Sequence, residues 1–562
     1  MVILTVFLLC GFAIVVMRLF VLQVLSAGYY KALAEDQYNF FKKLTPNRGE
    51  IKITDTFSAE GYTVATNVKK NLVYVVPKDI MDNTLTATHL APIVEMEVAD
   101  IEGKLSDKSR QYVIVKRQLT EDQEEKIRAL KLPGINFEPE VVRFYPEKKF
   151  LSNVLGFVGY KDTEKIGLYG LEKSFEKELA GRPGTLSQER DTTGAWIFGG
   201  KREFHPAQDG NNLILTIDRS IQFKAQTVIE ETVTKHSADS GCILVMNPGT
   251  GGVLAMASFP NFDPNEYNKV EDPAAFNNIC STGTYEPGSI FKAITMAAAV
   301  DTGKVNSNTT YVDTGEVKID GYTIKNSDNK AHGVQTMTQV LEQSLNTGVI
   351  FAQKQVGEDI FLEYVKKFGF GKKTGIELPE TEGDLKNLNG TIAVNFHTAS
   401  FGQGISVTPL QMVQSYSVFA NSGKMVHPYI VQAQITPTGE TISAKPPVIE
   451  QVVSEKTAST ITTMLVNVVE NGHGNKAKVA GYYVAGKTGT AQVPRKDGKG
   501  YEPNNNIGSF IGFAPASDPK FVMLVRVNHP RTVQFAESTA GPAFGEMAQF
   551  ILNYYNIPPT RK

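Results

Sequence analysis

Serine, lysine and threonine side chains recur in this 562-residue chain in patterns that could perform acyl transfer. Acyl transfer needs a serine hydroxyl, a base that takes its proton, and donors that stabilise the oxyanion formed at the attacked carbonyl. Three short patterns contain such groups: Ser-x-x-Lys, Ser-x-Asn and Lys-Thr-Gly. Each pattern occurs more than once, so the surrounding sequence must indicate which copy is the candidate.

The best Ser-x-x-Lys candidate begins at Ser289. A proline and a glycine precede it and the apolar run Ala293–Val300 follows, which predicts a helix start with an exposed hydroxyl and unpaired N–H groups. Lys292 lies three residues on, shares the helical face of Ser289, and could take the serine proton once it is desolvated. The other copies lie in a charged helical segment, a polar turn and a polar loop, and begin at Ser174, Ser327 and Ser517.

Ser-x-Asn occurs at residues 327–329 and again at Ser344 and Asn346. The first copy lies in a polar turn without apolar residues on either side. The second copy lies between a helical run, 337–343, and an apolar run, 349–356. A corner between two helices can project two polar side chains into a cleft, so Ser344 and Asn346 are the predicted pair.

Lys-Thr-Gly occurs at Lys373, where it leads into a loop, and at Lys487. The second copy follows a predicted strand at 481–485 and continues through Thr488 and Gly489. Glycine at the edge of a strand would let a substrate backbone pair alongside, and Lys487 would add a positive charge for a peptide carboxylate. The Lys487 copy is therefore the candidate.

These residues need a scaffold, and the flanking sequence predicts one. Asp218 can cap a helix with one apolar face, and two strands joined by a tight turn follow it. Three further strands and a last helix end the chain. This order predicts one antiparallel sheet built from both ends of a domain, with a helical region between them. The predicted strands span 242–246, 253–258, 481–485, 509–513 and 521–527, and the last helix spans 546–554.

The first 25 residues form an apolar stretch with a single charge, Arg18. As a helix that rises about 1.5 Å per residue, this stretch is long enough to span a hydrocarbon core of roughly 30 Å. It lacks the marks of a cleaved signal peptide. We therefore expect a retained transmembrane anchor at 1–25. Residues 26–205 show no catalytic cluster and are predicted to be a non-catalytic pedestal. A polar segment, 199–212, is the predicted boundary to a catalytic domain at 206–562.

The composition excludes several classes of protein. The formal net charge is −2, without the concentrated basic face that a nucleic-acid binder needs, so no nucleic-acid partner is expected. The three cysteines form no CxxC motif or Cys/His cluster, which argues against a structural zinc site or a disulfide framework. We expect neither a metal nor a cofactor.

The three chosen motifs, in this order, resemble those of the penicillin-binding protein and serine β-lactamase superfamily. The resemblance extends over nearly the whole chain and is specifically to class B penicillin-binding proteins. It implies an α+β fold with a transmembrane helix, an elongated mixed pedestal (dimerisation-like) domain, and a transpeptidase domain whose central antiparallel sheet is flanked by helices. The further segments that resemble this class are Arg18–Val24, Arg48–Ile51, Arg143–Pro146, Gly167–Glu172, Thr408–Gln411 and Ser509–Ala514.

Membership of this class would make the protein a peptidoglycan D,D-transpeptidase. Ser289 would attack the penultimate D-Ala carbonyl of a stem peptide, with Lys292 as the general base. Ser344, held by Asn346 and Lys487, would pass a proton to the leaving amine.

The same resemblance assigns the remaining site residues and the setting. The N–H groups of Ser289 and Thr490 would form the oxyanion hole, and Thr488 and Thr490 would hold the donor carboxylate. The resemblance implies stem peptides as substrates, β-lactams as covalent inhibitors, and a polytopic glycosyltransferase as partner. It also implies a single-pass protein of the cytoplasmic membrane with an extracytoplasmic catalytic domain.

Several alternatives remain open at this point. The motif contexts favour a division or sporulation type, acting at the septum, over an elongation type. A β-lactamase or β-lactam sensor is disfavoured by the pedestal motifs, and a non-catalytic division scaffold by the intact chemical positions. Residues 494–506, rich in glycine, asparagine and charge, are predicted to form a mobile loop at the edge of the site.

Overall fold

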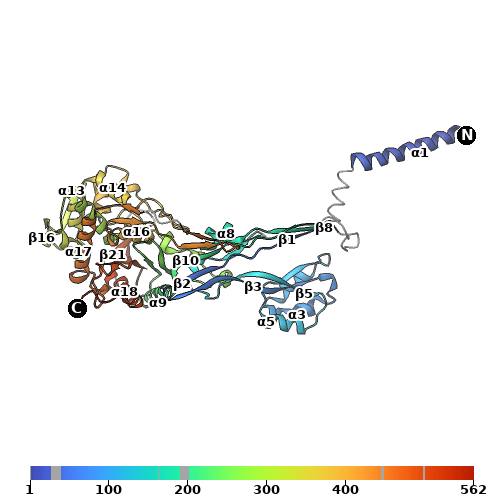
Figure 1. The fold of residues 1–562 in the computed structure, drawn as a ribbon, viewed down its shortest axis with the longest axis horizontal. Helices are drawn as coiled ribbons and strands as arrows, with labels where there is room; N and C mark the ends of the chain where they lie inside the picture. The colour runs from blue at the N-terminus through green and yellow to red at the C-terminus, as the bar shows by residue number, and fades with distance from the viewer. Residues whose placement is uncertain are drawn as a thin grey trace. The chain divides into compact units, whose positions relative to one another are not determined.

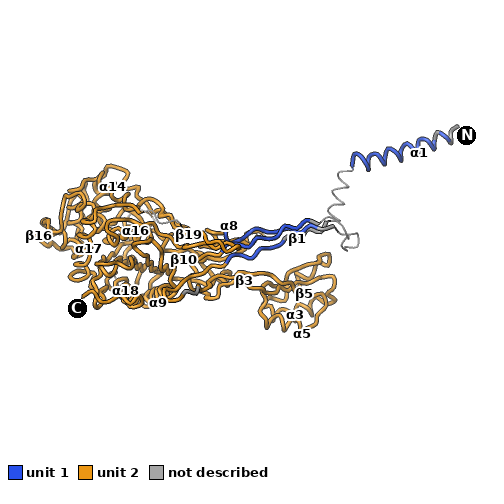
Figure 2. The backbone as a smooth tube through the Cα atoms, viewed as in Figure 1, with its two compact units in different colours: residues 1–49, 177–211 blue, residues 50–176, 212–562 orange. Residues whose placement is uncertain are grey.

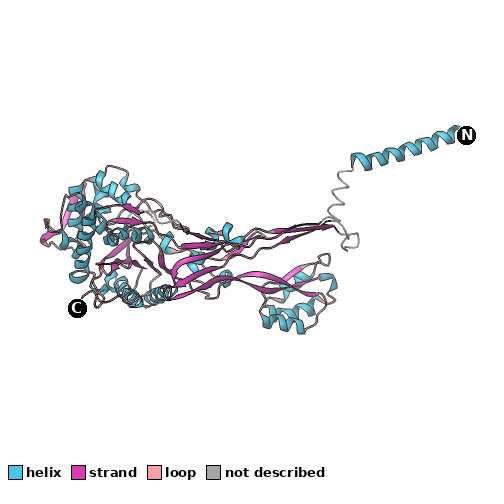
Figure 3. Cartoon of the chain, viewed as in Figure 1, coloured by secondary structure: helices cyan, strands magenta, loops and turns pink. Residues whose placement is uncertain are grey.

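The structure is a computed structural model that describes residues 2–26, 39–162, 164–189, 202–444, 449–495, 497, 500–533 and 535–561. The chain divides into two compact units, residues 1–49 with 177–211 and residues 50–176 with 212–562 (Figure 2). Helices and strands both contribute to the second unit (Figure 3), which agrees with the predicted α+β class.

The first unit contains an apolar helix and a small sheet. The apolar helix α1 (Val2–Phe20) continues into a π-helical turn, η1 (Val21–Leu25), and no part of its span Phe7–Leu25 is buried. The sheet joins β1 (Asn39–Leu44), β8 (Gly184–Glu189) and β9 (Arg202–His205) in antiparallel pairs. Of the predicted boundary segment 199–212, residues 199–201 lie outside the described residues.

The second unit begins with a sheet whose strand order is β19-β18-β10-β2-β3-β4, with β5 also paired to β3. The long strand β3 pairs with β5 from Thr66↔Phe144 to Val75↔Ile135, and three helices pack their apolar residues against the end of this pair. The predicted pedestal, 26–205, and the predicted catalytic domain, 206–562, both contribute strands to this sheet, because β2 pairs with β10 in parallel. Its elements are β2 (Ile51–Asp55), β3 (Ser58–Val75), α3 (Asn83–Val94), α4 (Val98–Leu105), β4 (Val113–Lys116), α5 (Glu121–Ala129), β5 (Ile135–Phe144), β10 (Asn212–Asp218), β18 (Val431–Ile435) and β19 (Thr441–Ser443).

A buried ion pair joins two of the segments that carried the family resemblance. Arg143 Nε lies 2.6 Å from Glu172 Oε1, and the Tyr145 hydroxyl donates to the same oxygen over 3.2 Å. Burial makes such a pair costly to break, because one partner alone would leave an uncompensated charge. The short elements that follow β5 in sequence are α6 (Ser152–Leu155), β6 (Val158–Lys161), β7 (Glu164–Gly167), α7 (Gly170–Ser174) and α8 (Glu176–Ala180).

The predicted central sheet is present, with order β12-β11-β23-β22-β21 and every neighbouring pair antiparallel. Helices α9 and α18 pack into one apolar core with it (Figure 1). Asp218 caps α9 as predicted, since its carboxylate accepts from the N–H groups of Ser220 and Ile221. The elements are α9 (Arg219–Lys235), β11 (Ser240–Met246), β12 (Val253–Phe259), β21 (Ala485–Pro494), β22 (Tyr501–Ala514), β23 (Phe521–Asn528) and α18 (Ala540–Tyr554).

Two local predictions near the site were wrong. The strand predicted at 481–485 begins only at Ala485, so Lys-Thr-Gly lies inside β21 rather than after a strand. The predicted mobile loop is largely a hairpin, because β22 begins at Tyr501, which pairs with Pro494. The pairing of β21 with β22, from Ala485↔Phe513 to Pro494↔Tyr501, decides where both strands begin and end.

The helical region lies in sequence between β12 and β21, as predicted, and also contains two small hairpins between α11 and α12. The helices are α10 (Ile279–Thr282), α11 (Lys292–Asp301), α12 (Met337–Glu342), α13 (Asn346–Val356), α14 (Glu358–Lys367), α15 (Ala393–Ser400), α16 (Pro409–Ala420) and α17 (Glu455–Asn471). The short strands are β13 (Thr310–Asp313), β14 (Glu316–Ile319), β15 (Tyr322–Lys325), β16 (Gly333–Thr336), β17 (Lys424–Val426) and β20 (Ile449–Gln451). The 3₁₀ turns are η2 (Pro77–Asp79), η3 (Pro264–Lys269), η4 (Pro273–Phe276), η5 (Gly288–Phe291), η6 (Lys386–Leu388), η7 (Asn475–Ala477) and η8 (Ala536–Ser538).

Candidate active site

Ser289 lies on the 3₁₀ turn η5, directly before α11, so the predicted helix start is present. Gly288 has a φ of +58°, which a side chain would strain, and its N–H donates to Gly402 O over 3.0 Å. A Cβ on Gly402 would come within 2.3 Å of the Gly288 oxygen. The glycine-containing segment around Gly402 thus packs against the turn and determines the position of Ser289.

Lys292 is the first residue of α11 and is fully buried. Its Nζ donates to the main-chain oxygen of Ser344 over 2.5 Å and to Ser344 Oγ over 3.2 Å. Burial, and then the positive charge of Lys487, hold the pKa of Lys292 well below that of an ordinary lysine. The hydrogen bonds of the described residues do not include one from Lys292 to Ser289; the lysine bonds to the second serine instead.

Ser344 lies at the predicted corner between α12 and α13, and its φ of +56° is left-handed. Such a conformation costs of order 1–3 kcal/mol in a residue other than glycine, so the surrounding structure must hold it. The two lysine side chains help to stabilise this conformation, because Lys487 Nζ, like Lys292 Nζ, donates to Ser344 Oγ, over 3.0 Å.

Lys487 lies in β21, the edge strand of the sheet, and is fully buried. Its Nζ also donates to Thr488 O over 3.1 Å. Burial lowers the pKa of Lys487 to about 7, although the carboxylate of Glu537 acts in the opposite direction. One hydroxyl, Ser344 Oγ, therefore receives hydrogen bonds from both motif lysines, whose charged forms burial disfavours.

Asn346 contributes differently from the expectation that it holds Ser344. Its side-chain amide donates to Lys325 O over 2.8 Å, and its main-chain N–H donates to Asn326 Oδ1 over 3.0 Å. Asn346 thus fastens the start of α13 to the segment after β15. That segment contains Ser327, the rejected Ser-x-Asn copy, which lines the same cleft as Ser289.

The three residues after Lys487 lie along β21. Thr490 lines the cleft, and its hydroxyl accepts a hydrogen bond from Ala536 N over 3.1 Å, while Thr488 is nearly buried. A Cβ on Gly489 would come within 2.9 Å of the main-chain oxygen of Pro287. The close approach that requires glycine is therefore to the turn that carries Ser289, whereas the sequence had indicated an approach by substrate.

A cleft of about 570 Å³ brings these motifs together, since Ser289, Asn346 and Thr490 all line it. Sequence reasoning missed much of its wall. Residues 323–327 and 329 form one part of the cleft wall. Another part comes from the segment 400–404, whose two glycines could have indicated a turn close to the site. The other missed residues that line the cleft are Thr398, Phe401, Gln403, Gln492 and Phe535. Asn506 also lines it and belongs to the segment 494–506 that was predicted at the edge of the site.

The rejected copies of two motifs have other surroundings. Ser174 and Ser517 are exposed, as predicted. Lys373 is exposed too, and the next residue, Thr374, donates from its N–H and its hydroxyl to Glu380 in a loop. Within the described ranges, no group of three or more His, Cys, Asp or Glu side chains could hold a metal ion.

Comparison with known families gives two matches. Residues 241–549 match the penicillin binding protein transpeptidase domain. Residues 43–215 match the penicillin-binding protein dimerisation domain.

Known proteins resemble the chain over nearly its whole length. Stage V sporulation protein D of Bacillus subtilis is 36% identical over 558 residues, which cover 98% of this chain and 85% of that protein. A protein of Neisseria gonorrhoeae named "Probable peptidoglycan D,D-transpeptidase PenA" is 28% identical, covering 98% and 92% of the two chains. The crystal structure of penicillin binding protein 3 from Mycobacterium tuberculosis, complexed with aztreonam, aligns with a TM-score of 0.71 and 25% identity, covering 92% of this chain and 99% of that one.

Proposed function

We propose that Ser289 is the nucleophile of this chain, which belongs to the class B penicillin-binding proteins of the division and sporulation type. The chain is a serine-type peptidoglycan D,D-transpeptidase. One observation carries this assignment: the buried amines of Lys292 and Lys487 both donate to Ser344 Oγ, and Ser289 lines the adjoining cleft. Each of the three motifs thus contributes a side chain to one small polar centre.

In the proposed acylation, Ser289 Oγ attacks the penultimate D-Ala carbonyl carbon of a stem peptide. Lys292 takes the hydroxyl proton, which its lowered pKa permits because the amine is then neutral at a moderate pH. Ser344 relays that proton from Lys292 to the nitrogen of the terminal D-Ala as the C–N bond breaks, so Lys292 is neutral again. An ester between Ser289 and the shortened peptide remains.

Lys487, Thr488 and Thr490 are proposed to bind the terminal carboxylate of the donor peptide. The N–H groups of Ser289 and Thr490 are proposed to stabilise the oxyanion. Gly489 lets β21 approach the nucleophile turn closely enough for these two N–H groups to act together.

The second half of the reaction uses the same groups. The amine of a second stem peptide attacks the ester carbonyl and loses a proton to Lys292. The ester C–O bond breaks as the cross-link forms, and Lys292 returns the proton to Ser289 Oγ. A β-lactam acylates Ser289 in the first step and leaves an ester that blocks the second.

The setting belongs to the proposal as well. The apolar span Phe7–Leu25 is proposed to cross the cytoplasmic membrane once, with the catalytic residues on the outer side. The relative named for stage V of sporulation supports action at a septum rather than along the side wall. A polytopic glycosyltransferase, contacted through the anchor and pedestal, is the proposed partner that supplies glycan strands. The proposed domain limits are 1–25, 26–205 and 206–562.

Covalent labelling by a fluorescent penicillin tests the nucleophile. The wild-type protein is expected to carry a stable label, and Ser289→Ala is expected to carry none. Ser517→Ala is the matched control, since it removes a serine of the same spacing that is exposed elsewhere. An unlabelled wild type, or a labelled Ser289→Ala, would overturn the assignment. Rapid loss of the label with hydrolysed penicillin appearing would indicate a β-lactamase.

A further inference from the structure

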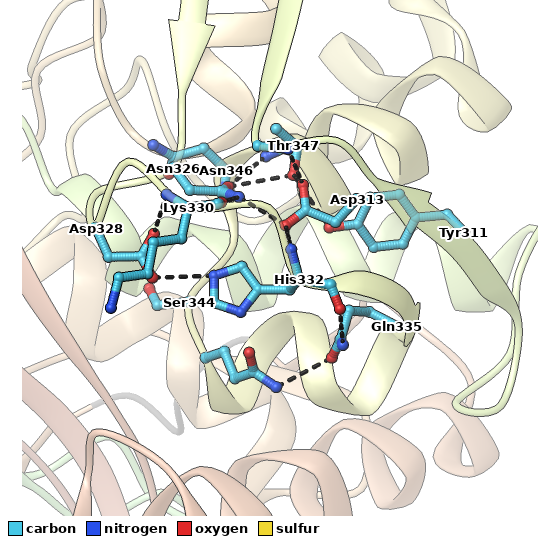
Figure 4. A network of polar contacts seen from close by, with 12 residues as sticks. Tyr311, Asp313, Asn326, Asp328, Lys330, His332, Gln335, Ser344, Asn346 and Thr347 are labelled. Carbon is cyan, nitrogen blue, oxygen red and sulfur yellow. Dashed lines mark hydrogen bonds and ion pairs between the residues drawn. The ribbon is translucent and has the colours of Figure 1, made fainter.

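Between α11 and α12 lie two small hairpins, β13 with β16 and β14 with β15, which we call the 310–336 insert. Nothing in the sequence motifs gave this insert a role. It nevertheless contains two buried polar side chains, Asp313 and Asn326, each 2% exposed. A third, Thr347, is 4% exposed and lies at the start of α13. Figure 4 shows the three side chains meeting in one network.

Asn326 caps the helix α13 from outside it. The first N–H groups of a helix have no partner within the helix, and the residue before α13, Leu345, has no side chain that could accept from them. Asn326 Oδ1 accepts from Asn346 N over 3.0 Å and from Thr347 N over 3.3 Å. A residue about 20 positions earlier in the chain thus does what a capping serine or aspartate does locally.

Asp313 fixes the orientation of Asn326. Its Oδ2 accepts from the Asn326 amide over 2.9 Å and from His332 N over 3.0 Å, while its Oδ1 accepts from Thr347 Oγ1 over 2.7 Å and from Gly315 N over 2.9 Å. Burial raises the pKa of Asp313, but these hydrogen bonds outweigh it and lower the pKa below its ordinary value. A charged carboxylate therefore holds the amide so that its oxygen faces α13.

This network adjoins the catalytic corner. Ser344 lies two residues before the helix start that Asn326 caps, in a left-handed conformation. Asn346 makes two bonds to the insert, one to Asn326 Oδ1 and one to Lys325 O. A shift of α13 would carry both Ser344 and Asn346 with it.

We propose that Asp313 and Asn326 are positioning residues of the transpeptidase site, which hold the Ser344–Asn346 corner against Lys292 and Lys487. The inference rests on the proposed function of Ser289 and Ser344. The two residues act through the helix start and take no part in bond making. Without them the corner is free to move, and Ser344 Oγ loses its fixed distance from the two amines.

The test measures acylation by a fluorescent penicillin at saturating concentration, together with the thermal midpoint of each variant. Asn326→Ala is expected to lower the saturating acylation rate about 10-fold or more, since small misplacements of catalytic groups are costly, while the dissociation constant of the initial complex changes by less than about threefold. Thr347→Val removes the hydroxyl that bonds Asp313 and is expected to lower the same rate. Thr347→Ser keeps that hydroxyl and is expected to restore it.

His332→Ala is the matched control. It removes the contact between His332 Nε2 and Asp328 Oδ2, which are 3.0 Å apart (Figure 4). The main-chain N–H of residue 332, which donates to Asp313, stays in place. Wild-type acylation rates in folded Asn326→Ala would overturn the inference, and so would a loss in His332→Ala as large as in Asn326→Ala. If Asn326→Ala does not fold, equal rates in Thr347→Val and Thr347→Ser decide against it. An unlabelled wild type would instead overturn the nucleophile assignment.

Discussion

At the scale of single residues, the site depends on two amines that share one hydroxyl. Lys292 and Lys487 both bond Ser344 Oγ, at 3.2 and 3.0 Å, and each is fully buried. Two positive charges so close together in a desolvated place repel each other, so the pair titrates as a unit. The proposed acylation requires a neutral Lys292 that accepts a proton and a charged Lys487 that attracts a carboxylate.

The rate of acylation by penicillin should therefore have a maximum with pH. On the acid side it rises as Lys292 loses its proton, at a pH far below that of an ordinary lysine because burial lowers its pKa. On the alkaline side it falls above pH about 7, where Lys487 loses its own proton. Stopped-flow labelling as a function of pH, from acid to alkaline through neutrality, measures the profile.

Glu537→Gln provides the control for this profile. The carboxylate of Glu537 raises the pKa of Lys487, so its removal should move the alkaline limb to lower pH. The acid limb should move less, because Glu537 shifts the pKa of Lys487 and acts on Lys292 only through the coupling of the two lysines. A profile that is flat across this range, or an alkaline limb that does not move, would contradict the assigned protonation states.

At the scale of elements, the site requires β21 to lie directly against the turn η5. Gly489 allows this, because a Cβ there would meet Pro287 O and Ile290 Cγ2 at 2.9 Å. The strand and the turn come from opposite ends of the catalytic region, and their separation decides how Thr490 lies relative to Ser289. A backbone contact of this kind gives way only when one of the two elements moves.

Gly489→Ala should consequently separate the strand from the turn. We expect a loss of about 1–3 kcal/mol in the free energy of unfolding, from overpacking, and a fall in the acylation rate of about 10-fold or more, from misplacement. Urea denaturation and penicillin labelling measure the two effects.

Gly390→Ala is the matched substitution for this prediction. A Cβ at Gly390 would meet no atom within 4 Å, so neither stability nor rate should change appreciably. A Gly489→Ala protein with wild-type acylation would show that the close packing of β21 on η5 is not needed for the reaction.

At the scale of the whole molecule, an apolar helix accompanies a catalytic region that has a large core of its own. The span Phe7–Leu25 has a mean hydropathy of 2.4 and is 0% buried. Exposed apolar surface of this size is unfavourable in water and favourable in a bilayer. The central sheet, by contrast, buries apolar residues in one core that it shares with α9 and α18.

Removal of residues 2–25 should release the protein from membranes without changing its chemistry. The full-length chain is expected to pellet with membranes after an alkaline carbonate wash, and the shortened chain to remain in the supernatant. Both should react with fluorescent penicillin at the same rate, since no group placed in the site belongs to that span. Full-length protein in the washed supernatant would contradict the membrane assignment.

The sequence by itself determined the features that depend on neighbours along the chain. The helix start at Ser289, the Asp218 cap and most of the five sheet strands follow from proline, glycine, capping and alternation patterns within a few residues of each other. The choice of Ser344 over Ser327 was also local, because only Ser344 lies between two apolar helical runs. The predicted strand at 481–485 was wrong because it too rested on a local pattern. That pattern favoured extended backbone, but the pairing with β22 begins only at Ala485.

Only the tertiary structure decided which polar groups meet. Lys292 bonds a serine 52 residues away rather than the one three residues away, and Lys487 bonds the same serine across 143 residues. Asn346 bonds the 310–336 insert, and Gly489 packs against the turn η5, which carries Ser289. Hydrogen bonds of this kind depend on distances of about 3 Å set by the packing of whole elements, and no spacing along the chain contains that information.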